Sequence, residues 1–137
     1  MGKIVIDSGL EEFVVEDKMG NIVGKIYFNP TDTGIIRRFD ESEERFKNLM
    51  KIDPEGKDEW EIIAEAEDKM RDLLDYIMGQ PCSHILFSVA QPMAVLADGS
   101  MYIEKVLEGL ETAINDAADA RNNRLTEKID KYARKYK

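Results

Sequence analysis

The sequence predicts an α+β fold: an N-terminal β-hairpin or small antiparallel sheet, followed by a mostly α-helical bundle with a long C-terminal helix. β-Branched and aromatic residues are concentrated before residue 30. After residue 30, apolar residues recur at spacings of three and four, which is the pattern of one buried helix face. The chain has 137 residues, of which 43% are hydrophobic. This length and composition predict a single domain, 1–137, with its own hydrophobic core.

Residues 1–29 form the predicted β-hairpin region. The segments "EFVVED" and "NIVGKIYF" have the composition of strands, and Gly20 and Asn21 between them supply a tight turn. The earlier segment "KIVI", separated from the hairpin by Ser8 and Gly9, predicts an additional strand.

The segment "NPTD" joins the hairpin to the helical region, which we expect over residues 31–137. Pro30 ends the strand because proline has no N–H to donate to a sheet, and it keeps Asn29 out of the helical conformation. Thr31 or Asp32 can then accept backbone N–H groups at the start of a helix. We therefore interpret this segment as a capped junction from strand to helix.

Two helices follow, separated by a break near 52–57 that contains Pro54 and Gly56. The first is predicted over about 31–50, with Arg37 or Arg38 facing solvent or an acidic neighbour. Its apolar stripe comprises Ile35, Phe39, Ser42, Phe46 and Leu49. The second is predicted over about 58–78, with Gly79 as a C-cap. Its buried side comprises Trp60, Ile63, Met70, Leu74 and Ile77.

Residues 79–100 are expected to be mostly loops. Pro81 and Pro92 bracket a segment that predicts a short buried helix, and a second helical turn is expected after Pro92, ending at Asp98 and Gly99. Ser100 could cap a final helix that starts near Met101 and continues almost to the end.

The final helix has two different halves. The first carries a strong apolar face: Ile103, Val106, Leu107, Leu110 and Ile114. A small, polar segment follows before the apolar spacing resumes at Leu125, Ile129, Tyr132 and Tyr136. We expect this distal half to project or to pack loosely, and an exposed apolar stripe is typical of an interaction surface. These four residues are the candidate partner-binding residues, and they favour either a homo-oligomer or a client complex.

The charge distribution separates an acidic body from a basic tail. The net charge is −9, but residues 121–137 contain seven basic and two acidic residues, which leaves about −14 on residues 1–120. An acidic body disfavours a nucleic-acid partner. No segment approaches the ~20 apolar residues of a membrane span, so no membrane partner is expected. The single cysteine, Cys82, cannot form an internal disulfide and favours the cytoplasm.

We predict no catalytic residue, metal site or cofactor. Cys82 and His84 are the best candidates for a nucleophile or a transition metal. A separation of two residues on a helix would point their side chains about 200° apart. The chain has neither a P-loop nor a dinucleotide-binding fingerprint. A small enzyme that uses both residues in one pocket remains an alternative.

The region from residue 20 to residue 39 resembles the small tail-assembly chaperones of long-tailed phages and prophages of Gram-positive bacteria. Members of that family often begin with a short hairpin, followed by Asn-Pro-x-Asp and a helix that contains Arg-Phe. The matching residues here are Gly20, Gly24, Phe28, Asn29, Pro30, Asp32, Arg38 and Phe39. A weaker resemblance covers "HILFSVAQPMAVLADGSMYIEKVLEGL".

The resemblance implies a protein that is not an enzyme. It would bind the tape-measure protein, with tail-tube subunits as a further candidate client, in the cytoplasm of a bacterial host cell during tail morphogenesis. A virion structural component or head-tail connector is the alternative from another class.

Overall fold

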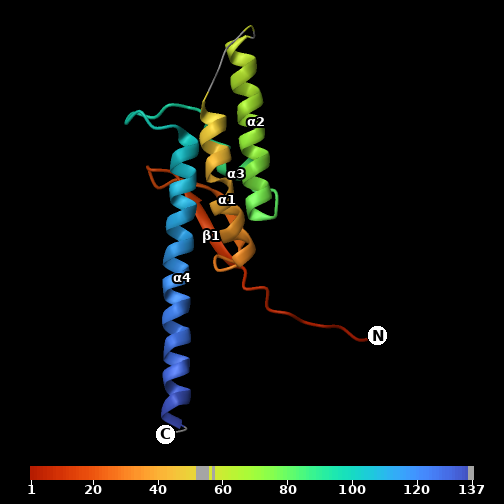
Figure 1. Ribbon diagram of the computed structural model, residues 1–137, viewed down its shortest axis with the longest axis vertical. Helices are drawn as coiled ribbons and strands as arrows, with labels where there is room; N and C mark the ends of the chain where they lie inside the picture. The colour runs from red at the N-terminus through yellow and green to blue at the C-terminus, as the bar shows by residue number, and fades with distance from the viewer. Residues whose placement is uncertain (52–55, 57, 136–137) are drawn as a thin grey trace.

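The computed structural model describes residues 1–51, 56 and 58–135, with side chains described as far as Lys131. It confirms the α+β fold, with a two-stranded antiparallel sheet followed by helices (Figure 1). The predicted break near 52–57 lies outside the described residues except at Gly56. The elements in chain order are β1 (Glu11–Glu16), β2 (Ile22–Phe28), α1 (Thr33–Met50), α2 (Glu59–Met78), α3 (Ser83–Leu86) and α4 (Tyr102–Lys135).

The hairpin forms as predicted, but the additional N-terminal strand does not. In the hairpin turn, the Asp17 side chain accepts hydrogen bonds from the backbone N–H groups of Met19 and Asn21, both at 2.9 Å. The segment expected to form the extra strand is unpaired, and Val5 is 83% exposed. A strand needs a neighbour for its backbone hydrogen bonds, and β1 and β2 pair only with each other among the described residues. Residues 1–7 instead extend away from the body (Figure 1), whereas the Ser8 and Gly9 carbonyls accept hydrogen bonds from Asn29 and Arg121.

α1 begins and packs where the sequence predicts. Asp32 is the N-cap, because its carboxylate accepts the Gly34 N–H at 2.8 Å. Ile35 and Phe46 are buried, and Phe39 packs partly against the core. The prediction that Arg37 or Arg38 faces solvent or an acidic neighbour holds for Arg37, which is exposed, but not for Arg38. Its side chain is partly buried, and Nε donates to the Ile77 carbonyl at 3.0 Å, near the end of α2.

α2 matches its prediction at the C-terminal end and differs at the N-terminal end. Met70, Leu74 and Ile77 are fully buried, and Gly79 is the C-cap in the left-handed conformation, with φ of 70°. Trp60, expected on the buried side, is 75% exposed. It lies in the first turn of α2, which extends past the end of α1 (Figure 1), so the described residues offer this turn no neighbour against which to bury the indole.

The segment between α2 and α4 contains one helical turn, α3, rather than two. The Asp75 carboxylate accepts hydrogen bonds from the Cys82 and Ser83 N–H groups at 2.9 and 2.8 Å, which fixes the start of α3. The helical turn predicted after Pro92 is wrong. The chain instead closes a tight turn, in which the Leu96 N–H donates to the Ser100 carbonyl at 2.8 Å.

α4 is capped one residue later than predicted. Ser100 does not cap the helix, because its N–H and hydroxyl both donate to Asp98. The Glu104 carboxylate accepts the Met101 N–H at 2.7 Å, so Met101 is the N-cap position and Glu104 supplies the acidic half of a capping box.

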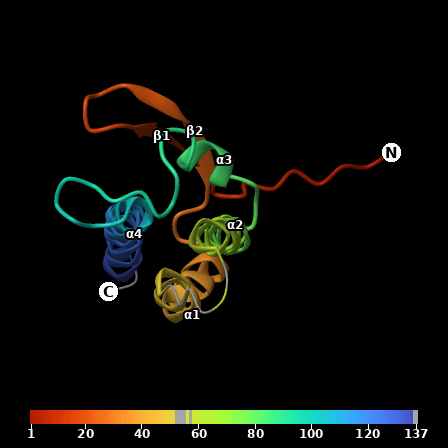
Figure 2. The ribbon, with the colours of Figure 1, turned by 90° about the horizontal axis from the view of Figure 1, so that it is seen from above.

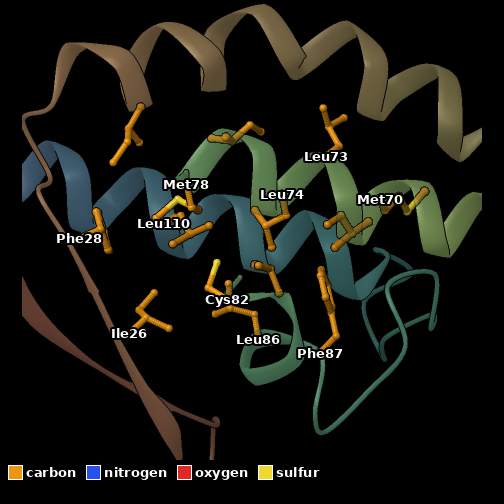
Figure 3. Packing of buried hydrophobic residues seen from close by; sticks show 14 of the residues in the cluster. Ile26, Phe28, Met70, Leu73, Leu74, Met78, Cys82, Leu86, Phe87 and Leu110 are labelled. Carbon is orange, nitrogen blue, oxygen red and sulfur yellow. The ribbon is translucent and has the colours of Figure 1, made fainter. Parts of the chain in front are cut away.

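One hydrophobic core joins β2, α1, α2, α3 and the first half of α4 (Figure 3). Viewed from above, the hairpin and α3 lie on one side of α2, α1 lies on the other, and α4 runs beside them (Figure 2). Ile103, Leu110 and Ile114 attach α4 to this core. The distal half of α4 continues well beyond it (Figure 1), as the sequence predicts.

Candidate functional site

Phe28, Asn29 and Pro30, three of the residues on which the resemblance rests, lie at the junction of the hairpin, α1 and α4. Phe28 is 1% exposed, and its ring stacks on Phe13 with centroids 4.3 Å apart. The Asn29 side-chain oxygen accepts hydrogen bonds from the Thr31 N–H and hydroxyl, both at 3.1 Å, and its amide donates to the Ser8 carbonyl. Pro30 is among the largest fully buried side chains. These contacts hold the junction rigid and leave it little room to bind a ligand.

Arg121 of α4 holds this junction together with hydrogen bonds. The sequence did not reveal this role, because Arg121 was counted only as part of the basic tail. Its guanidinium donates to the side-chain oxygens of Asn29 at 2.6 Å and Thr31 at 2.7 Å. It also donates to the Gly9 carbonyl at 2.9 Å and forms an ion pair with Glu11 at 2.7 Å. Because the partners precede it by 90 residues or more, only the folded chain reveals the contact. Arg121 therefore fixes the direction in which α4 leaves the body.

Arg38 of α1 has a similar structural role at the C-terminal end of α2. Besides its hydrogen bond to Ile77, its guanidinium lies 5.9 Å from the centre of the Tyr76 ring. A cation near the C-terminus of α2 is favoured by the helix dipole and by the orphan carbonyls there. Arg38 thus ties α1 to the end of α2.

A groove of about 400 Å³ lies between α1 and the first half of α4. Its floor is apolar and comes from both helices: Ile36, Phe39, Phe46, Met50, Leu107 and Ile114. Ile36 is 41% exposed, and Phe39, Met50 and Leu107 are partly exposed. Such a floor can take an apolar helix stripe, since helix-in-groove recognition uses side chains spaced three and four residues apart.

The rim of the groove is acidic. It contains one basic residue, Lys47, and five acidic residues, which give it a net charge of −4: Asp40, Glu43, Glu104, Glu108 and Glu111. Glu43 pairs with Lys47 at 3.5 Å, and Glu108 pairs with Lys105 at 3.5 Å. Asp40 and Glu111 form no ion pair within the described part of the chain. The groove therefore favours a ligand that is apolar on one face and basic beside it.

The predicted partner-binding residues lie on the projecting half of α4. Leu125 is 56% exposed and Ile129 is 58% exposed, and the described residues supply no neighbour for either. The side chain of Tyr132 and the whole of Tyr136 lie outside the described part of the structure. The structure therefore does not bring Leu125 or Ile129 to the groove of the same chain.

The structure separates the two residues considered for catalysis. Cys82 is 2% exposed and points into the core beside Leu86 (Figure 3), whereas His84 is exposed on α3. Burial, with a further contribution from Asp75, raises the pKa of the Cys82 thiol to about 12. The thiol is therefore neutral at physiological pH and is shielded from substrates. Among residues 1–51, 56 and 58–135, no group of three metal-binding side chains gathers.

No helix in the described parts of the chain is both long and apolar enough to span a membrane. Comparison with known proteins gives no match to a protein family, to a characterised protein or to a solved structure. The groove and the projecting helix are thus the features from which a function can be argued.

Proposed function

We propose that this chain is a non-enzymatic assembly chaperone or adaptor that binds an amphipathic helix of a structural client. The observation that supports it best is the groove between α1 and α4, with its apolar floor and its rim of net charge −4. A client helix with an apolar stripe and basic flanks would bury the stripe on Phe39, Phe46 and Leu107 and place its cations beside the rim.

The resemblance of residues 20–39 to phage tail-assembly chaperones suggests which client this is. We propose the tape-measure protein, whose long helical segments would need protection in the host cytoplasm until the tail assembles. Tail-tube subunits are a further candidate. The acidic character of the chain supports this role, since its net charge of −9 keeps chaperone molecules that surround an apolar client from aggregating.

Co-expression with a tape-measure protein encoded beside this chain tests the proposal. The wild-type chain should raise the soluble fraction of the client, and the groove variant Asp40→Lys/Glu108→Lys/Glu111→Lys should not. A matched control, Glu61→Lys/Glu65→Lys, changes exposed acids of α2 and should behave as wild type. A client whose solubility is the same with and without the wild-type chain would contradict the proposal.

A further inference from the structure

The projecting half of α4 has the chemistry that the groove requires. Residues 121–135 carry six basic and two acidic residues, a net charge of +4, against −4 on the groove rim. Leu125 and Ile129 supply an exposed apolar stripe beside these charges. We propose that, in the free protein, the distal half of α4 from a second copy occupies the groove, and that the exchange is reciprocal.

The lengths of the two surfaces agree. The α1 wall of the groove runs from Ile36 to Met50, and 14 helical steps of about 1.5 Å span about 21 Å. Residues 121–135 of α4 also span 14 steps, again about 21 Å. A single projecting helix therefore fills the groove from end to end.

The groove wall and the distal stripe lie on one face of α4. Leu107 lines the groove, and Leu125 follows it 18 residues later, which is about five full turns at about 3.6 residues per turn. Glu111 and Ile129 have the same separation. When a second α4 lies antiparallel along this face, its distal half therefore occupies the groove of the first copy. The distal half of the first copy occupies the groove of the second in the same way.

Electrostatics selects the antiparallel arrangement. Residues 102–120 of α4 carry five acidic residues and one basic residue, a net charge of −4, whereas residues 121–135 carry +4. Antiparallel pairing places each acidic half beside a basic half, and parallel pairing places like charges together. The midpoint of the pair falls near residue 119, where Ala118 on the shared face is small enough for two helices to approach closely.

A two-fold dimer of this kind covers both surfaces that the single chain leaves open. The interface is closed, because each copy offers the same groove and the same helix and no site remains for a third copy. The inference concerns the free protein and stands whether or not the proposed client is correct. If the client is correct, its helix and the second copy compete for one groove.

A reciprocal charge swap tests the inference. The groove variant Asp40→Lys/Glu108→Lys/Glu111→Lys changes the rim to a net charge of +2, and the tail variant Arg124→Glu/Lys128→Glu/Lys131→Glu changes residues 121–135 to −2. Each variant alone then sets like charges against each other, whereas a mixture of the two restores attraction at both grooves. All six positions are exposed, so circular dichroism should show an unchanged helix content.

Sedimentation equilibrium at loading concentrations from about 1 to about 100 µM, which bracket the dissociation constant of a dimer of micromolar affinity, measures the self-association of each protein. At the highest concentration, wild type and the Glu61→Lys/Glu65→Lys control should sediment at twice the 15.7 kDa chain mass. Each swap variant should be at least tenfold weaker in self-association, and an equimolar mixture should regain the dimer. A monomeric wild type, swap variants that self-associate as tightly as wild type, or a mixture that associates no more tightly than either variant alone would each overturn the inference.

Discussion

Replacing Arg121 by alanine is expected to destabilise the protein by about 2 kcal/mol. The loss comes mainly from the hydrogen bonds to Asn29 and Thr31, which are partly buried and worth roughly 1 kcal/mol each after exchange with water. The ion pair with Glu11 adds at most about 0.5 kcal/mol, because the Glu11 side chain is 44% exposed. Gly9 and Glu11 are free to bind water once the guanidinium is removed.

Urea denaturation followed by circular dichroism measures this change, and thermal unfolding should show a decrease in Tm of roughly 6 °C for a domain of this size. The matched control is Arg124→Ala, which removes an exposed arginine one turn further along α4 and should cost less than about 0.5 kcal/mol. Arg121→Lys should be intermediate, because an ammonium cannot reach two acceptors with the geometry of a guanidinium. Equal stabilities for Arg121→Ala and Arg124→Ala would refute the role assigned to Arg121.

Three further predictions concern the interior and one helix end. Ser42→Ala should raise stability by about 1 kcal/mol, because the Ser42 hydroxyl is buried with no hydrogen-bond partner in the described structure. Ser83→Ala should lower stability by about 1 kcal/mol, because the Ser83 hydroxyl donates to Asp75 at 2.8 Å. Urea denaturation of the two variants should therefore show changes in unfolding free energy of opposite sign. Because burial raises the pKa of the Cys82 thiol to about 12, the unfolded chain releases this proton first as pH rises above about 8.5. Stability should therefore fall more steeply between pH 8 and pH 10 in wild type than in Cys82→Ala, and parallel curves would argue against a buried neutral thiol. Gly79→Ala should cost about 1 kcal/mol, since φ is 70° there, and a thermal melt equal to wild type would contradict the left-handed cap.

Local signals in the sequence predict most of the secondary structure. The Gly20-Asn21 turn, the Asp32 cap and the Gly79 cap each depend on residues within a few positions, so the chemistry that fixes them can be read directly. The helix faces follow for the same reason, since apolar spacing selects which side of α1 and α2 is buried.

The features that the sequence did not predict correctly all depend on which elements become neighbours in space. "KIVI" has strand composition but finds no strand beside it, and Trp60 lies on the predicted face of α2 but beyond the end of α1. The contacts of Arg121 cross 90 residues or more. The groove likewise needs α1 and α4 to lie side by side, which no local pattern specifies. The apolar stripe on the distal half of α4 could be predicted from the sequence, but the groove that complements this stripe could not.

Disulfide trapping between two α4 helices tests the antiparallel pairing most directly. In the proposed dimer, Ala118 lies on the face of α4 that meets the second copy, near the midpoint of the pair. Close packing of small residues then brings the two Cα atoms to roughly 6 Å, within the range that a disulfide spans. Ala120 lies just as near the midpoint but on the opposite face, where the two Cα atoms would be more than about 12 Å apart.

Mild oxidation of Ala118→Cys should therefore give a covalent dimer on a non-reducing gel, and Ala120→Cys should remain monomeric under the same conditions. The native Cys82 should not interfere, because it is 2% exposed. Cross-linking of Ala120→Cys as fast as Ala118→Cys, or no cross-linking of Ala118→Cys, would contradict the pairing of α4 with a second copy of itself.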